Sequence, residues 1–66
     1  MGMEENIILE NGDYWVYREN KAYVVYKTGL THSTSDSAFA LTENGKSIAI
    51  ARCNYLAKRD AEKTAG

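Results

Sequence analysis

A chain of 66 residues is long enough for one domain, and its eight Lys and Arg against nine Asp and Glu give a formal net charge of −1. A near-neutral chain lacks the strongly basic field of a general nucleic-acid binder. One cysteine and one histidine exclude an internal disulfide and are too few for a structural zinc site. No apolar run approaches the ~20 residues of a membrane span, and the start of the chain is acidic where a signal peptide is basic. We therefore expect a cytoplasmic protein.

The first hairpin is indicated by an Asn-Gly pair between two runs of β-branched and aromatic residues. Asn11-Gly12 separates NIILE from DYWVYR, and both residues of such a pair accept the positive φ that a type I′ turn requires. We therefore expect strands over residues 6–10 and 13–18. A two-residue loop would set Glu10 opposite Asp13, a mildly repulsive pair.

Two further strands follow along the chain. The run AYVVYK has the same composition and predicts a third strand over residues 22–27. The small and polar segment over residues 28–37 predicts a loop. The short run AFALT is a candidate fourth strand over residues 38–42. These segments together predict a three- to four-stranded antiparallel meander.

The C-terminal part of the chain is rich in Ala, Arg, Leu and Lys, which favour a helix over residues 47–63. Ser47 is a suitable N-cap, because its hydroxyl can accept a hydrogen bond from an amide of the first turn. At helical spacing one apolar face contains Ala49, Ile50, Cys53, Leu56 and Ala57. A strand over residues 47–51 is the alternative, since Asn44-Gly45 is also a hairpin signal and SIAIA alternates.

The predicted fold is therefore α+β. A single domain over residues 1–66 packs a C-terminal helix on one face of an antiparallel sheet. We expect residues 1–5 and 64–66 to be disordered.

Gly45-Lys46-Ser47 matches the second half of a phosphate-binding P-loop. In the complete motif a first glycine precedes Gly45, and Ala40 occupies that position. Glu43 also places a negative charge where the phosphates would lie. We interpret the segment as a turn at Asn44-Gly45 followed by a capped helix, and not as a nucleotide site.

The segment THSTSDS, residues 31–37, contains Ser, His and Asp as near neighbours. Catalytic triads assemble from separate segments, so we interpret this one as a polar loop with His32 exposed. Cys53 lies on the apolar helix face and is expected to act as a small apolar residue. The other carboxylates show no paired acid–base arrangement: Asp36, Glu43, Asp60 and Glu62. We expect no catalytic residue, no cofactor, no metal site and no enzyme activity.

Aromatic residues are over-supplied in the second and third predicted strands. If Asn20-Lys21 forms a two-residue turn, Trp15 lies opposite Tyr26, and successive residues face opposite sides of the sheet. One face then carries Trp15, Tyr17, Val24 and Tyr26. The other carries Tyr14, Val16, Arg18, Tyr23, Val25 and Lys27, joined by Ile7 and Leu9. A single helix covers only one of these faces.

The uncovered, Tyr-rich face predicts an interaction surface, because exposed apolar patches mark binding sites and Tyr and Arg are enriched in interface hot spots. We expect a non-enzymatic module that forms a homodimer or binds a protein partner. The short, proline-free and motif-poor chain resembles small orphan reading frames of bacteria and their phages, so we expect a regulatory or accessory role. The predicted partner-binding residues are Tyr14, Val16, Arg18, Tyr23, Val25 and Lys27.

A nucleic-acid-binding protein is the alternative. In it, Tyr14 and Tyr23 would stack on bases, and the sheet would contact phosphates through Arg18, Lys21 and Lys27. A secondary stripe on one side of the helix contains Arg52, Tyr55 and Arg59. The net negative charge of the chain argues against this alternative.

Overall fold

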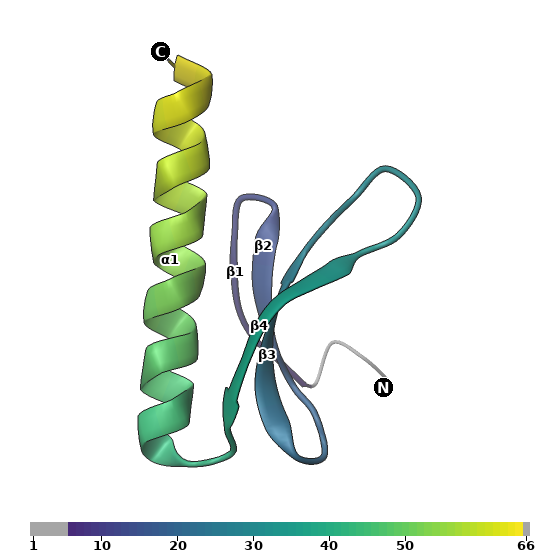
Figure 1. Cartoon of the computed structure of the whole chain (residues 1–66), viewed down its shortest axis with the longest axis vertical. Helices are drawn as coiled ribbons and strands as arrows, with labels where there is room; N and C mark the ends of the chain where they lie inside the picture. The colour runs from purple at the N-terminus through teal and green to yellow at the C-terminus, as the bar shows by residue number, and fades with distance from the viewer. Residues whose placement is uncertain (1–5, 66) are drawn as a thin grey trace.

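The computed structural model describes residues 6–65, which form a four-stranded antiparallel sheet followed by one long helix (Figure 1). The strands lie in the sheet in chain order, β1-β2-β3-β4. The elements are β1 Ile7–Asn11, β2 Tyr14–Arg18, β3 Ala22–Lys27, β4 Thr34–Ala40 and α1 Glu43–Ala65. The predicted α+β fold, an antiparallel meander followed by a C-terminal helix, is confirmed.

The first hairpin turns one residue later than predicted. Asn11 pairs with Tyr14, so the two loop residues are Gly12 and Asp13. Gly12 has a positive φ of 62°, and no non-glycine residue among those described has a positive φ. Positive φ at the first loop residue alone is the pattern of a type II′ turn, and the type I′ prediction is wrong. The repulsive Glu10–Asp13 pair does not form.

The register of the two central strands is confirmed. Trp15 pairs with Tyr26, and Tyr17 pairs with Val24, as the two-residue turn predicts. Because directly opposed residues share a face, this register brings three aromatic side chains together on one side of the sheet.

The fourth strand begins earlier than predicted. β4 takes in Thr34–Ser37, a polar segment predicted to be a loop, and it ends at Ala40. Lys27 at the end of β3 pairs with Thr34, with a register shift next to Tyr26. β4 is an edge strand, so its small polar side chains keep contact with water while its backbone pairs with β3.

The helix also begins earlier than predicted, at Glu43, and it continues to Ala65. The N-cap is Thr42 and not Ser47, because the Oγ1 of Thr42 accepts a hydrogen bond of 3.0 Å from the amide of Gly45. The carbonyl of Thr42 accepts the first helical bond, from the amide of Lys46, at 2.8 Å. Residues 64 and 65, predicted to be disordered, belong to the helix, and the predicted disorder of residues 1–5 and of Gly66 lies outside the described residues.

The position of the cap gives a first prediction. Replacing Thr42 by Ala is expected to lower the free energy of unfolding by about 1 kcal/mol, because a first-turn amide loses its acceptor. Ser47 lies inside the helix, so replacing it by Ala is expected to change stability by less than about 0.5 kcal/mol. Urea unfolding of the two variants measures the difference. Equal losses would contradict a cap at Thr42.

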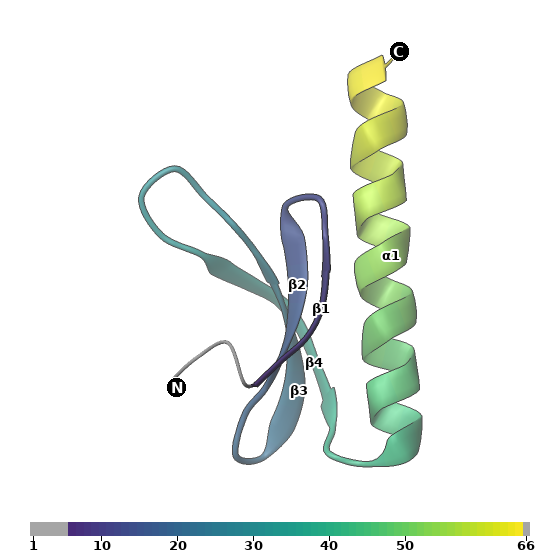
Figure 2. The same cartoon turned by 180° about the vertical axis from the view of Figure 1, so that it is seen from behind.

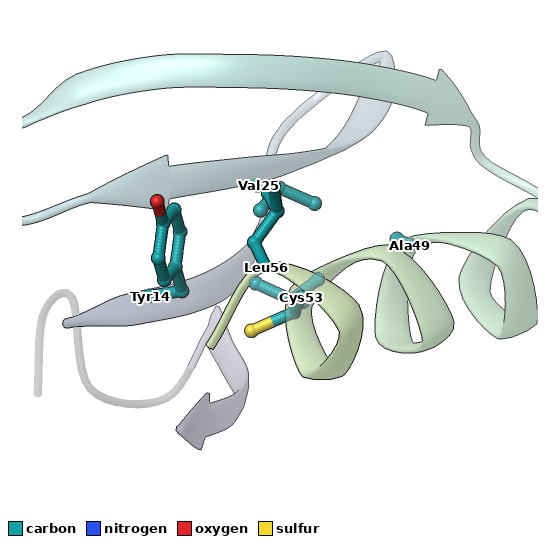
Figure 3. Close-up of a cluster of buried hydrophobic side chains, with 6 residues drawn as sticks. Tyr14, Val25, Ala49, Cys53 and Leu56 are labelled. Atoms are coloured by element: carbon teal, nitrogen blue, oxygen red, sulfur yellow. The ribbon is translucent and has the colours of Figure 1, made fainter. Parts of the chain in front are cut away.

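The core lies between α1 and one face of the sheet (Figures 1 and 2). Figure 3 shows Tyr14 and Val25 of the sheet in one cluster with the helix residues Ala49, Cys53 and Leu56. The buried cluster between helix and sheet is made of Tyr14, Val16, Val25, Ala49, Cys53 and Leu56. Ile8, Leu9, Tyr23, Phe39 and Ala57 pack around it. Ala49, Cys53, Leu56 and Ala57 of the predicted apolar helix face thus make the contact, whereas Ile50 is half-buried and lies outside this cluster. The small side chains let the helix lie close to the strands.

Candidate functional site

The sheet face opposite the helix carries the aromatic surface of the molecule. Trp15 and Tyr17 alternate along β2 with the buried Tyr14 and Val16, so they point away from α1. Tyr26 joins them from β3, opposite Trp15. In the part of the chain that the structure describes, no helix or strand lies across this face (Figures 1 and 2). We call Trp15, Tyr17 and Tyr26 the aromatic cluster.

The rings of the aromatic cluster contact one another. Trp15 stacks on Tyr26 with ring centroids 4.6 Å apart and an angle of 22° between the planes. Tyr17 stands edge-on to both rings, with centroids 5.9 Å from Trp15 and 6.4 Å from Tyr26. Offset stacks and edge-on contacts are the favoured arrangements of aromatic pairs. Each of the three residues is half-buried, so part of every ring stays accessible to solvent.

Two hydrogen bonds hold the rings in place. The Nε1 of Trp15 donates to the Oγ1 of Thr28 at 3.2 Å. The hydroxyl of Tyr26 donates to the Oε2 of Glu19. This bond is the main cause that raises the pKa of Tyr26 above its ordinary value of 10.0, with burial adding to it. The cluster is therefore preorganised, with polar atoms at its rim already bonded.

A shallow hollow of about 260 Å³ lies within this face, lined by Trp15, Tyr17, Glu19 and Tyr26. Its one charged residue is acidic. Glu10 lies on the same face, because it pairs with Trp15. The open face is thus aromatic with acidic side chains beside the rings.

The predicted partner-binding residues lie on the face that the helix covers. Tyr14, Val16 and Val25 belong to the buried core, with exposed fractions of 4%, 0% and 0%. Tyr23 packs against that core, and Ile7 lies opposite Tyr17 on the other face. Arg18 and Lys27 are exposed at the rim. The expectation that this face is open is therefore corrected: the alternation of residues is right, and the face left uncovered is the other one.

At the edge of the covered face, Tyr14 connects the sheet to the helix. Its hydroxyl donates to the Oδ2 of Asp60 at 2.9 Å, and the Nζ of Lys27 lies 3.7 Å from the same oxygen. The hydrogen bond from Tyr14 is the main cause that lowers the pKa of Asp60 below its ordinary value of 3.8, with Lys27 and Arg59 adding to it. Burial, followed by the bond to Asp60, raises the pKa of Tyr14 above 10.0.

The lowered pKa of Asp60 predicts a pH dependence of stability. A carboxyl with a lowered folded pKa stabilises the fold above its unfolded pKa, and this contribution is lost as the pH falls through the folded value. We expect the free energy of unfolding to decline between about pH 5 and about pH 2, and the decline to be smaller in the Asp60→Asn variant. The Tyr14→Phe variant is also expected to show a smaller decline, because the substitution removes the hydrogen bond that is the main cause of the lowered pKa of Asp60. Denaturant unfolding over this pH range, with Glu62→Gln as a control, is the measurement; an unchanged decline in both variants would contradict it.

In the secondary stripe Arg52, Tyr55 and Arg59, Arg52 is half-buried against β4, whereas Tyr55 and Arg59 are exposed. The Nε of Arg52 bonds to the Oδ2 of Asp36 at 3.1 Å, and its guanidinium lies 5.7 Å from the ring centre of Tyr55. The Nη2 of Arg59 lies 3.6 Å from the Oδ1 of Asp60 and forms an ion pair with it. A shallow groove between helix and strand is lined by Ser37, Phe39, Ile48, Ala51, Arg52 and Tyr55. Two basic residues of the stripe are thus next to carboxylates.

The other sequence motifs do not assemble into a site. His32 bonds to Thr31, at 2.9 Å, and Asp36 bonds to Ser37 and Arg52, so no Ser-His-Asp relay is formed by these neighbours. Gly45 is buried in the first helical turn against Ala40, so the predicted turn at Asn44-Gly45 is wrong. Burial raises the pKa of the Cys53 thiol.

Within residues 6–65 no group of three or more His, Cys, Asp or Glu side chains has the geometry to hold a metal ion. Over the same residues no helix has both the length and the apolar composition to cross a bilayer. Comparison of the chain with protein-family models, curated proteins and solved structures found no match.

Proposed function

We propose that this chain is a small, non-enzymatic interaction module that binds a protein partner through its open sheet face. The observation that supports this proposal is the aromatic cluster on the face opposite the helix. Trp and Tyr provide large contact area at low entropic cost and dominate interface energetics. A rigid cluster of three rings has the composition of an interface centre. A cytoplasmic location and a bacterial or phage origin stay predictions.

The charge around the cluster favours a protein partner over a nucleic acid. Glu10 and Glu19 are the charged residues beside the rings, and a phosphate backbone is repelled by carboxylates. Lys27 is directed to the helix side, where it pairs with Asp60. Tyr14, one of the two predicted base-stacking residues, is buried. The nucleic-acid alternative therefore has little support.

Affinity capture with matched variants tests the proposal. Wild-type protein on a resin is compared with Trp15→Ala/Tyr26→Ala, which removes the stacked pair, and with Leu30→Ala, which removes an exposed apolar side chain elsewhere. We expect wild type and Leu30→Ala to retain the same polypeptides from a lysate of the natural host, and the double variant to lose them. Circular dichroism checks that each variant is folded. Equal retention by the double variant would overturn the proposal.

Self-association is a second candidate, and a different surface favours it. Two open faces placed together would bring the Glu10 and Glu19 carboxylates of both copies into one interface, where they repel one another. The edge of β4 instead offers unpaired backbone groups, without proline or lysine in the strand. Beside that edge, Ile48 and Tyr55 are exposed large apolar residues of the groove. A second copy that adds its own β4 edge would continue the sheet and cover both.

Light scattering coupled to size exclusion separates this dimer from a monomer. We expect a dimer that becomes monomeric in Ile48→Glu, and that persists in Leu30→Glu, where the exposed leucine lies on the β3–β4 loop. Val25→Asp is unsuitable as a test of association, because Val25 belongs to the core and the variant would unfold. A wild-type monomer at millimolar concentration would reject the β4 dimer and leave the open-face proposal intact.

A further inference from the structure

The hollow within the open face has a composition that selects its ligand. Its lining is three aromatic rings and one carboxylate: Trp15, Tyr17, Tyr26 and Glu19. Aromatic faces attract cations through their quadrupole, most strongly at Trp, and a carboxylate adds a full opposite charge. Among residues 6–65, neither Lys nor Arg lines the hollow. The hollow is therefore complementary to a positive group.

The size and shape of the hollow indicate what carries that charge. At about 260 Å³ and open to solvent, it is smaller than the ~300–1,000 Å³ pockets that enclose metabolites, and it matches one inserted side chain. A planar guanidinium can stack on an open ring face and donate hydrogen bonds in its own plane. An ammonium is compact and strongly hydrated, so it gains less on a shallow surface.

Glu19 is placed to bond such a group. Its Oε2 accepts the hydroxyl of Tyr26, which orients the carboxylate toward the rings. A carboxylate oxygen has more than one acceptor position, so the group can accept from a guanidinium without releasing Tyr26. Trp15 is held by Thr28 and Tyr26 by Glu19, so little side-chain entropy is lost on binding.

We propose that this hollow binds an arginine side chain of the protein partner, stacked against the aromatic cluster and hydrogen-bonded to Glu19. The proposal rests on the proposed function for the identity of the partner as a protein. Arginine recognition itself can be measured on the isolated chain.

Short peptides test it. The blocked peptides Gly-Arg-Gly, Gly-citrulline-Gly and Gly-Lys-Gly are titrated at low salt into the full chain, and the indole N–H resonance of Trp15, the chain's one tryptophan, is followed by NMR. We expect a saturable shift with the arginine peptide, and at least about fivefold weaker binding of its neutral isostere citrulline and of lysine. No shift with arginine, or equal affinity for citrulline or lysine, would overturn the proposal.

Two carboxylate variants form a matched pair. Glu19→Gln is expected to lower the affinity for the arginine peptide about fivefold. Glu10→Gln, on the same face but outside the hollow, is expected to leave this affinity nearly unchanged. Equal effects would reduce the contact to a general acidic field and overturn the proposal. Capture of a partner that survives Glu19→Gln and shows no arginine preference would reject the arginine site and keep the interaction module. Arginine binding without any captured protein would keep the arginine site and reject the interaction module.

Discussion

The Gly45→Ala variant is expected to lose about 3 kcal/mol of stability or more, which is a large part of what a small domain possesses. A Cβ built at Gly45 lies 1.8 Å from the carbonyl oxygen of Ala40 and 2.8 Å from its carbon. These atoms are backbone at the end of β4, so they can move only by shifting the strand end or the first helical turn. The gain in helix propensity from Gly to Ala is about 1 kcal/mol, and it is too small to offset this clash.

Gly12→Ala is the matched control for this prediction. Gly12 has a positive φ of 62°, but its added Cβ meets only the Ala57 side chain, at 3.8 Å. The expected loss is about 1–2 kcal/mol, the cost of a left-handed conformation for alanine. Urea unfolding monitored by Trp15 fluorescence compares the variants. A loss at Gly45 equal to or smaller than the loss at Gly12 would contradict the close approach of helix and strand.

The second large effect is expected at Leu56. Replacing it by Ala should cost about 2–5 kcal/mol, because Leu56 is 1% exposed and removing its methyl groups leaves a cavity between helix and sheet. Leu30 provides the control, since it is fully exposed at the loop after β3. Leu30→Ala is expected to change stability by less than about 0.5 kcal/mol. Thermal unfolding by circular dichroism measures both. Similar midpoints for the two variants would place Leu56 outside the core.

The register of the central strands could be predicted from local sequence, because one rule decides it. A two-residue turn at Asn20-Lys21 requires Trp15 opposite Tyr26. The same rule failed by one residue in the first hairpin. Asn11 pairs with Tyr14, and its Nδ2 donates to the Oδ1 of Asn54 on the helix at 2.8 Å. This contact joins residues far apart in the chain, so it cannot be inferred from local turn preferences.

The start of the helix could not be predicted for a related reason. Ser47 and Thr42 are both good caps, and Asn44-Gly45 resembles a turn. The close approach to Ala40 requires a residue without a side chain at Gly45, and this requirement overrides the low helix propensity of glycine. The polar strand start at Thr34 was missed because edge pairing with β3 decides it, and side-chain composition does not.

The sequence contains a signal for which sheet face the helix covers. The contact face of the helix contains Ala49 and Cys53, whose small side chains bring the helix close to the sheet. A close helix fits the medium-sized Val16 and Val25 better than the indole of Trp15. The side-chain volumes on both sides of the interface favour the correct face. The number of tyrosines does not distinguish the two sheet faces.

The measurement that tests the central claim most directly is the solvent exposure of the two sheet faces in the purified chain. A soluble gadolinium chelate broadens NMR signals of protons near the surface. The predicted result is strong broadening of the ring protons of Trp15 and Tyr17, with the methyl groups of Val16 and Val25 protected under the helix. Protected rings beside broadened valine methyls would mean that the helix covers the aromatic cluster, and both the interaction face and its arginine site would be lost.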